Sequence, residues 1–299
     1  MIRVLLVEEN EAEAKEAIAM LRQSGQEEIH VTHVARLSSA LRRLAGESFD
    51  AILLDGALVD THGLDTLDLV QAALARLPIV VMSDQQNLAL ERKAIQRGVQ
   101  DFVVKKQWTP ELLARSVHHA VDRKRAEQNL AYLAQYDPLT ALANRALFHD
   151  RLIHALAMAK RKKQEVGIIL LAIDRFHEIK AELPAEGADV LLTSVAERLK
   201  RCMREVDTVA RLGGDVFTCL LEGVGSKGDM EIVANRILKS MASPVKVQDQ
   251  EVSLSPSLGI AVFPLDGQEA DQLLERAKSA MARAQESGGG FYMHPAQWQ

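Results

Sequence analysis

Charged and polar side chains follow four short apolar runs in the first third of the chain. Glu8 and Glu9 follow the first run, Asp55 and Ser83 close two later runs, and Lys105 follows a fourth. Because the reactive site of an open α/β sheet lies at the carboxyl ends of its strands, these side chains are expected to converge. Carboxylate oxygens suit Mg²⁺. The metal and Lys105 would offset the charge of a phosphoryl group transferred to Asp55, with Ser83 donating to its oxygens.

The elements that must position these residues alternate between β-branched runs and amphipathic stretches. This alternation is typical of βαβ units and a parallel sheet. We therefore expect a five-stranded, doubly wound α/β domain over residues 1–120. Its expected strands are 2–7, 29–34, 51–54, 79–82 and 102–104, and its expected helices are 11–23, 38–45, 64–76 and 88–97.

A long helix is expected after this domain. Pro110 suits the first turn of a helix, and the stretch from there to Tyr136 contains no further Gly or Pro. Residues 121–136 are then a helical linker between two domains. The helix is either a solvated connector or a coiled-coil stalk that couples two copies of the chain.

The second half of the chain, residues 137–299, has a different pattern. Its helices interleave with hairpins, and Gly213 and Gly214 mark a tight turn between two strands. The pattern indicates an α+β domain with a mostly antiparallel sheet. The expected helices are 145–163, 185–203, 229–241 and 270–287, and the expected strands are 166–173, 208–212, 216–221, 245–247 and 252–262.

The first 120 residues resemble the receiver domain of two-component response regulators, which has a flavodoxin-like fold. The resemblance implies that a sensor histidine kinase or a phosphotransfer protein phosphorylates Asp55. It also implies that Glu8, Glu9 and Asp55 hold Mg²⁺, and that Ser83, Phe102 and Lys105 form the phosphorylation switch. The matching segments are LLVEE (5–9), DGALVDTHG (55–63, with Asp60), VMS (81–83) and DFVVK (101–105).

Four features depart from the receiver pattern. The pair Glu8-Glu9 is longer than the usual pair containing Asp, and Val59 and Lys106 replace prolines of the family. Asp84 replaces a small residue beside the phosphate. A carboxylate at this position would repel a phosphoryl dianion if it pointed inward.

Residues from Tyr136 to about His294 resemble the GGDEF diguanylate cyclase domain, which has a nucleotidyl-cyclase-like α+β fold. In active members, two domains face each other, each with one GTP and divalent metals, and join the nucleotides into cyclic di-GMP. The matching segments are DPLTALANR (137–145), IDRF (173–176), VAER (195–198), DTVARLGGDVF (207–217) and SLGIAVFP (257–264).

Several functional positions of that family are replaced. Ala172 replaces the first metal-binding aspartate, Lys180 replaces the guanine-binding asparagine, and Val216 replaces the fourth residue of the signature. Gln285 and Gly289 stand where the family has its phosphate-binding Lys and Arg. We therefore interpret the domain as a degenerate cyclase, unless Asp174 serves as the metal ligand. A residual nucleotide site remains at Asp189, Gly213, Gly214 and Asp215.

A second ligand site is implied by the same resemblance. Arg204 and Asp207 form an Arg-x-x-Asp motif, and Arg236 lies on the next expected helix. In the family, this combination is the inhibitory site for cyclic di-GMP. Arginine can donate to guanine O6 and N7 or to a phosphate, and a carboxylate accepts from guanine. The alternative is a surface ion pair near a turn.

Composition restricts the function classes. The chain of 299 residues carries 36 Lys and Arg against 41 Asp and Glu, a net charge of −5, so nucleic-acid binding is not expected. Cys202 and Cys219 lack metal-ligand spacing and are expected to be reduced core residues. No membrane span or secretory signal is visible.

These observations lead to one preferred function and two alternatives. We expect a cytoplasmic, homodimeric response regulator in cyclic di-GMP signalling. Its inactive GGDEF domain would bind cyclic di-GMP or a downstream signalling protein. The alternatives are an active diguanylate cyclase and a dimeric scaffold that binds no nucleotide.

Overall fold

The structure is a computed structural model that describes residues 1–23, 28–57, 77–84, 88–96 and 98–294; the side chains of residues 88–90 and 227 are not described. The chain divides into two compact units, Met1–Leu130 and Ala131–Gln299. The expected helix over 64–76 lies outside the described residues. Among the helices that the structure describes, none combines the length and apolar character needed to cross a membrane.

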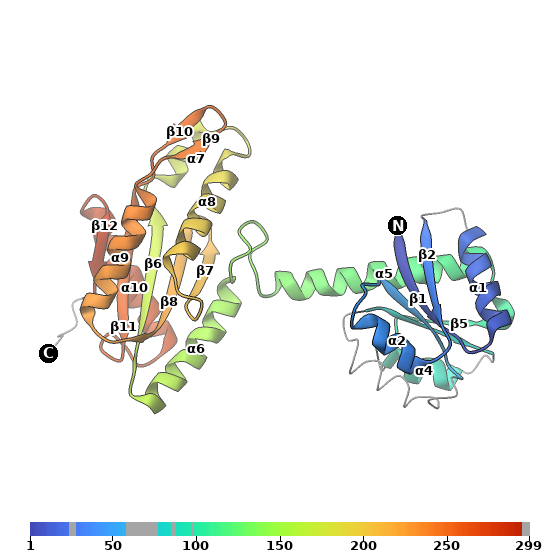
Figure 1. Ribbon diagram of the computed structural model, residues 1–299. Helices are drawn as coiled ribbons and strands as arrows, with labels where there is room; N and C mark the ends of the chain where they lie inside the picture. The colour runs from blue at the N-terminus through green and yellow to red at the C-terminus, as the bar shows by residue number, and fades with distance from the viewer. Residues whose placement is uncertain (24–27, 58–76, 85–87, 97, 295–299) are drawn as a thin grey trace. The chain divides into compact units, whose positions relative to one another are not determined.

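The first unit contains a parallel five-stranded sheet in the order β2-β1-β3-β4-β5 (Figure 1). This architecture confirms the expected doubly wound α/β domain. The strands are β1 (Ile2–Val7), β2 (Ile29–Val34), β3 (Ala51–Asp55), β4 (Ile79–Ser83) and β5 (Asp101–Val104). The helices are α1 (Glu11–Gln23), α2 (Leu37–Leu44), α4 (Leu88–Gln96) and α5 (Pro110–Leu133), with a 3₁₀ turn, η1, at Lys105–Gln107.

Side chains of β1 alternate between two apolar layers because successive residues of a strand point to opposite faces. Val4 and Leu6 pack with the buried residues of α1 and α5, whereas Leu5 and Val7 pack with those of α2 and α4. Both faces of the sheet are therefore covered. The carboxyl ends of the strands remain as the edge where polar side chains gather.

Helix α5 is one continuous helix of 24 residues. It ends at Leu133, three residues before the expected end, because Tyr136 turns back and forms a β-bridge with Ala143. Leu130, Tyr132 and Leu133 are exposed. Whether this surface is a solvated connector or part of a coiled coil stays a prediction.

The second unit contains a sheet in the order β12-β11-β6-β8-β7 and a two-stranded sheet of β9 and β10. Among the strand pairs of the described residues in this unit, only β11–β12 is parallel, so the mostly antiparallel α+β fold is confirmed. The strands are β6 (Glu165–Ile173), β7 (Thr208–Gly213), β8 (Val216–Val224), β9 (Val245–Val247), β10 (Gln250–Val252), β11 (Pro256–Phe263) and β12 (Gly290–Met293).

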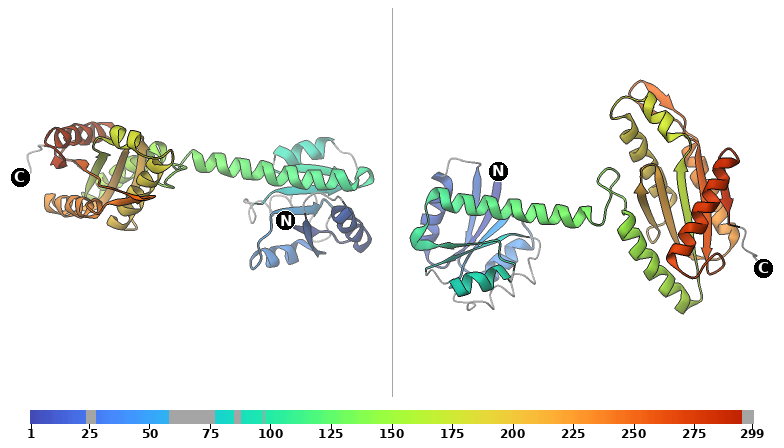
Figure 2. Two further views of the ribbon diagram at one scale, coloured as in Figure 1. Left: turned by 90° about the horizontal axis from the view of Figure 1, so that it is seen from above. Right: turned by 180° about the vertical axis from the view of Figure 1, so that it is seen from behind.

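Five helices belong to this unit, and four of them cover the sheet. Helices α8 and α9 pack on one face of the sheet, and α6 and α10 pack on the other. The right panel of Figure 2, a view from behind, shows the face with α10. The helices are α6 (Arg145–Lys162), α7 (Phe176–Glu182), α8 (Gly187–Cys202), α9 (Lys227–Met241) and α10 (Ala270–Glu286). Asn144 caps α6 by accepting a hydrogen bond from the Leu147 amide.

Three elements differ from the expected pattern. Helix α7 precedes α8 as a separate short helix, and the strand expected over 252–262 is divided between β10 and β11. Strand β12 was not expected, because three glycines precede its short apolar run.

Close packing explains one glycine of β11. A Cβ atom on Gly259 would lie 2.0 Å from the Ala277 carbonyl oxygen of α10.

Candidate functional site

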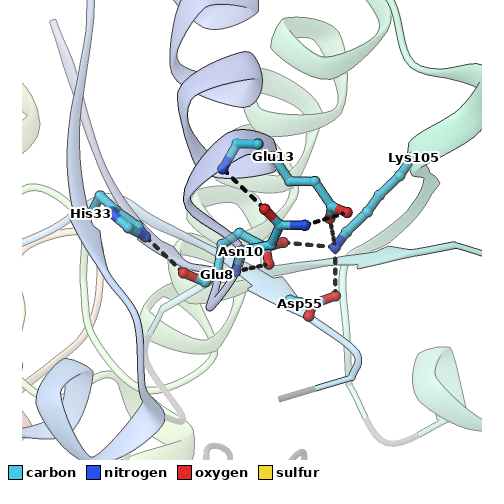
Figure 3. A network of polar contacts seen from close by, with 7 residues as sticks. Glu8, Asn10, Glu13, His33, Asp55 and Lys105 are labelled. Carbon is cyan, nitrogen blue, oxygen red and sulfur yellow. Dashed lines mark hydrogen bonds and ion pairs between the residues drawn. The ribbon is translucent and has the colours of Figure 1, made fainter. Parts of the chain in front are cut away.

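Lys105 joins two of the predicted phosphorylation-site carboxylates at the carboxyl edge of the parallel sheet. Its Nζ lies 2.7 Å from Glu8 Oε2 and 2.9 Å from Asp55 Oδ1 (Figure 3). The strand register accounts for this meeting, since Val7 pairs with Leu54 and so brings the following residues, Glu8 and Asp55, side by side. Lys105 also forms an ion pair with Glu13 of α1, a residue that sequence reasoning missed.

These ion pairs are buried. The side chains of Lys105, Glu8 and Asp55 are 6%, 2% and 7% exposed. Burial raises the pKa of Glu8 above its ordinary value, although hydrogen bonds from Lys105 and the Asn10 amide act in the opposite direction. Burial acts to lower the pKa of Lys105, but its hydrogen bonds to carboxylates outweigh burial and raise it. Lys105 therefore stays charged at physiological pH.

The other predicted receiver residues lie around this cluster. Glu9 and Asp84 are exposed, Ser83 is half-buried at the end of β4, and Phe102 is half-buried against the apolar layer of α2. Lys106 is exposed in η1. Val59 and Asp60 lie outside the described residues. The roles assigned to Ser83 and Phe102 as switch residues stay predictions.

The carboxylates around Lys105 offer a donor set for Mg²⁺. Glu8 and Asp55 offer buried hard oxygens, which is the chemistry that Mg²⁺ prefers, and the ion commonly binds through one or two carboxylates while keeping several waters. Within the described part of the chain, no three acidic, histidine or cysteine side chains are arranged to hold a metal. The residues therefore fit a metal held by Glu8 and Asp55 with water, whereas Glu9 points to the surface.

In the second unit, a second network holds the turn between β7 and β8. Arg211 donates from Nε and Nη2 to the Gly214 carbonyl oxygen at 3.0 and 2.7 Å. Its Nη1 lies 3.2 Å from both carboxylate oxygens of Asp137. Burial acts to raise the pKa of Asp137, but hydrogen bonds from Thr140 and Arg211 outweigh it and lower the pKa. The Gly213-Gly214 turn is thus fastened to a loop far back in the sequence.

The replaced and the retained nucleotide-site positions of the second unit differ in burial, and two of the replaced ones, Ala172 and Val216, are partners in the register of β6 and β8. Ala172 is 4% exposed and belongs to the apolar layer that α6 and α10 cover. Lys180 is exposed on α7, Asp189 is exposed in the first turn of α8, and Asp215 and Val216 are half-buried beside the turn.

Asp174 lies beside a cavity of about 540 Å³ whose lining includes Ser255, Gln285 and Gly288. Ser255 Oγ donates to Asp174 Oδ2 at 3.1 Å, and the buried Asp174 Oδ1 has no hydrogen-bond partner among the described residues. Gly289 lies close to Ser255 and Asp174. Its φ of +103° suits glycine, and a Cβ there would lie 3.1 Å from Ser255 Oγ and 3.4 Å from Asp174 Oδ2.

The predicted ligand site around Arg204 is formed by a turn after α8 and by α9. The Asp207 carboxylate accepts a hydrogen bond from the Arg204 amide at 2.8 Å, so it shapes this turn. Cys202 Sγ lies 3.8 Å from the Arg236 carbonyl oxygen, which places the end of α8 against α9. Arg204 and Arg236 are exposed, and in the described residues neither guanidinium has a protein partner. Both arginines are available to a ligand.

Both cysteines are buried and free, as the sequence indicated. Burial raises the pKa of the Cys219 thiol. The two thiols are therefore unreactive core groups in this structure.

A parallel sheet with a buried Asp–Lys–Glu cluster, together with an α+β unit with a Gly-Gly-Asp turn, defines a signalling protein built from a receiver and a nucleotidyl-cyclase-like domain. The family described as "Diguanylate cyclase, GGDEF domain" matches residues 134–290, and "Response regulator receiver domain" matches residues 4–117. The chain belongs to the GGDEF family and carries a receiver domain fused to it.

Two curated relatives are similar to a little over half of the chain. The chain is 36% identical over 181 residues to "Bifunctional diguanylate cyclase/cyclic di-GMP phosphodiesterase MucR" of Pseudomonas aeruginosa, a match that covers 60% of this chain and 26% of the relative. It is 37% identical over 163 residues to "Diguanylate cyclase TpbB" of Pseudomonas aeruginosa, covering 54% and 38%. The chain therefore spans well under half the length of these relatives.

Solved structures agree with the fold of the second unit. The GGDEF domain of TpbB from Pseudomonas aeruginosa matches with 36% identity and a TM-score of 0.52, covering 53% of this chain and 94% of that domain. A sensory box/GGDEF family protein from Caulobacter crescentus matches with 32% identity and a TM-score of 0.50, covering 52% and 100%.

Proposed function

We propose that the chain is a cytoplasmic response regulator in which phosphorylation of Asp55 sets the state of a catalytically inactive GGDEF domain. That domain acts as a receptor for cyclic di-GMP or as a surface for a downstream signalling protein. The observation that carries the proposal is the buried Ala172, an apolar residue where an active relative needs a metal-binding carboxylate.

Phosphorylation requires Asp55 as the nucleophile. One of its carboxylate oxygens attacks the phosphorus of a phosphohistidine on the kinase or phosphotransfer protein. A P–O bond forms as the P–N bond breaks, and the histidine nitrogen leaves with the electron pair. Lys105, 2.9 Å from Asp55, offsets the negative charge that gathers on the phosphoryl oxygens. Mg²⁺ held by Glu8 and Asp55 would supply further charge neutralisation.

Several observations support an inactive cyclase site. Gln285 cannot supply the positive charge of a lysine, and the backbone of Gly289 has a φ that L side chains rarely adopt. A single cationic clamp on phosphates can contribute about 10³ to 10⁵ in rate. The combined loss of a metal carboxylate and two cations therefore removes useful turnover.

An active diguanylate cyclase is the second candidate. Two features favour it: the relatives named as diguanylate cyclases, and Asp174, whose buried Oδ1 has no hydrogen-bond partner. In this alternative, Asp174 and Asp215 would bind the metal in place of the missing carboxylate at position 172.

Incubation of the purified chain with GTP and either Mg²⁺ or Mn²⁺ separates the two candidates. We expect chromatography to detect no cyclic di-GMP. Sustained turnover by the wild type that is lost in Asp215→Ala would establish the cyclase instead. Calorimetry with cyclic di-GMP then tests the receptor function, and a chain that gives no heat up to about 100 μM ligand would act as a scaffold without nucleotide.

A further inference from the structure

Glu13 contacts the switch lysine from outside the strand ends. It lies in the first turn of α1, and its side chain is 31% exposed, against 6% for Lys105. One oxygen, Oε2, forms the ion pair with Lys105, and the other, Oε1, accepts a hydrogen bond from Asn10 Nδ2 at 3.1 Å (Figure 3). Glu13 is therefore held at both oxygens and directed at the phosphorylation pocket.

Helix capping alone does not account for this position. Asn10 Oδ1 accepts from the Ala12 amide and thereby caps α1. In a capping box, the glutamate three residues after the cap accepts a hydrogen bond from the backbone N–H of the cap residue. Here the Asn10 N–H donates to Glu8 Oε1 at 2.9 Å instead. The Glu13 carboxylate is thus left for Lys105.

Lys105 forms ion pairs with three carboxylates, those of Glu8, Glu13 and Asp55. Its ammonium, which has donors and no acceptor, donates hydrogen bonds to Glu8 and Glu13. Glu8 and Asp55 have roles of their own in the proposed metal and phosphoryl chemistry. Glu13 has no such role, so its effect on the pocket is to add a negative charge and to hold the ammonium toward α1.

We infer that Glu13 is a positioning residue that restrains Lys105 in the unphosphorylated receiver and competes with the phosphoryl group for its ammonium. The inference rests on the proposed phosphorylation of Asp55. The added negative charge disfavours an anion in the pocket and favours a cation. Removal of the Glu13 charge should therefore change the affinities for a phosphoryl mimic and for Mg²⁺ in opposite directions.

Beryllofluoride, a mimic of the phosphoryl group, tests the anion side. Its binding to the full chain is measured by ¹⁹F NMR at saturating Mg²⁺ for wild type, Glu13→Gln and Glu11→Gln. Glu11 is the matched control, because it lies in the same helical turn, is 82% exposed and pairs only with Lys15 in the described structure. We expect Glu13→Gln to bind the mimic about three- to tenfold more tightly, and Glu11→Gln to match the wild type.

Calorimetry with Mg²⁺ alone tests the cation side and excludes a merely structural effect. We expect weaker Mg²⁺ binding in Glu13→Gln, because Lys105 is then free to pair more fully with Glu8 and Asp55. A variant that had only loosened the fold would lose affinity for both ligands. Asp55→Asn should show no bound beryllofluoride, which identifies the signal with the phosphorylation pocket.

The outcomes separate this inference from the proposed function. Wild type and Glu13→Gln with equal affinity for the mimic would overturn the role of Glu13 while leaving Asp55 as the phosphoacceptor. A mimic that binds Glu13→Gln but not the wild type would show that Glu13 restrains Lys105 strongly enough to prevent binding. Failure of both proteins to bind it would remove the role of Glu13 together with the phosphorylation proposal.

Discussion

Arg211 and Asp137 lie 74 residues apart in the sequence, yet the arginine Nη1 is 3.2 Å from both carboxylate oxygens of the aspartate. Their side chains are 12% and 18% exposed. The same guanidinium holds the Gly214 carbonyl oxygen. This pair therefore couples the loop before α6 to the turn that gives the domain its signature.

Asp137→Asn should destabilise the GGDEF unit by about 1 to 3 kcal/mol, because a largely buried arginine loses its charged partner. The pKa of Asp137 is depressed below its usual 3.8 in the folded state, so the charge stabilises the fold above that pH. The stabilisation is lost as the pH falls through the lower, folded-state pKa. Urea unfolding of wild type and variant should therefore differ at pH 7 and converge toward pH 3.

Glu178→Gln serves as the control for this prediction. It breaks the Arg175–Glu178 pair, whose side chains are 78% and 58% exposed, and should leave the stability nearly unchanged because solvent screens such a pair. If both variants lost the same free energy of unfolding, the Arg211–Asp137 pair would contribute no more to stability than an exposed ion pair.

Cyclic di-GMP is expected to bind at Arg204, Asp207 and Arg236 without dependence on Asp215. Truncation of a charged partner in a desolvated contact costs about 2 kcal/mol or more, about thirtyfold in affinity. Arg204→Ala should weaken binding by at least this factor in titration calorimetry. Arg201→Ala, which removes another exposed arginine close by on α8, should not. Full affinity in Arg204→Ala would mean that the ligand binds elsewhere.

Beryllofluoride with Mg²⁺ is expected to shift the full chain toward dimers, because the mimic occupies the pocket of Asp55, Ser83 and Lys105. Light scattering measures the mass before and after addition. Asp55→Asn should remove the shift. An unchanged mass in the wild type would mean that phosphorylation does not control assembly.

Lys105→Met should destabilise the receiver unit by about 3 to 5 kcal/mol at neutral pH, because Glu8 and Asp55 then lie buried without their cation. Loss of Lys105 raises the pKa of Glu8 further, so the Glu8 carboxylate becomes neutral more readily in the folded state. The destabilisation should therefore be smaller at pH 5 than at pH 8.

The fluorescence of Trp108, a buried residue of the receiver core, reports this unfolding once Trp298, the other tryptophan of the chain, is replaced by Phe. Lys106→Met, a change at the exposed neighbour, should leave the urea midpoint unchanged. A Lys105→Met protein as stable as the wild type at pH 8 would contradict a structural role for the cluster.

The sequence by itself determined the two folds and the meeting of Glu8, Asp55 and Lys105. Periodicity reports which residues of a strand or helix face the core, and parallel strands bring their carboxyl ends to one edge. Both patterns are local in the sequence, and each determines one arrangement of side chains. The motifs around Asp55 and Gly213-Gly214 then identified the families, which the comparisons confirmed.

Only the tertiary structure decided which distant side chains became partners. Glu13 reads in the sequence as one of several acidic residues that open a helix, and only the packing of α1 beside the strand ends brings it to Lys105, 92 residues away. The Arg211–Asp137 pair and the conformation of Gly289 depend likewise on long-range packing. Helical and strand periodicity describe one element at a time, whereas these contacts depend on the placement of several elements at once.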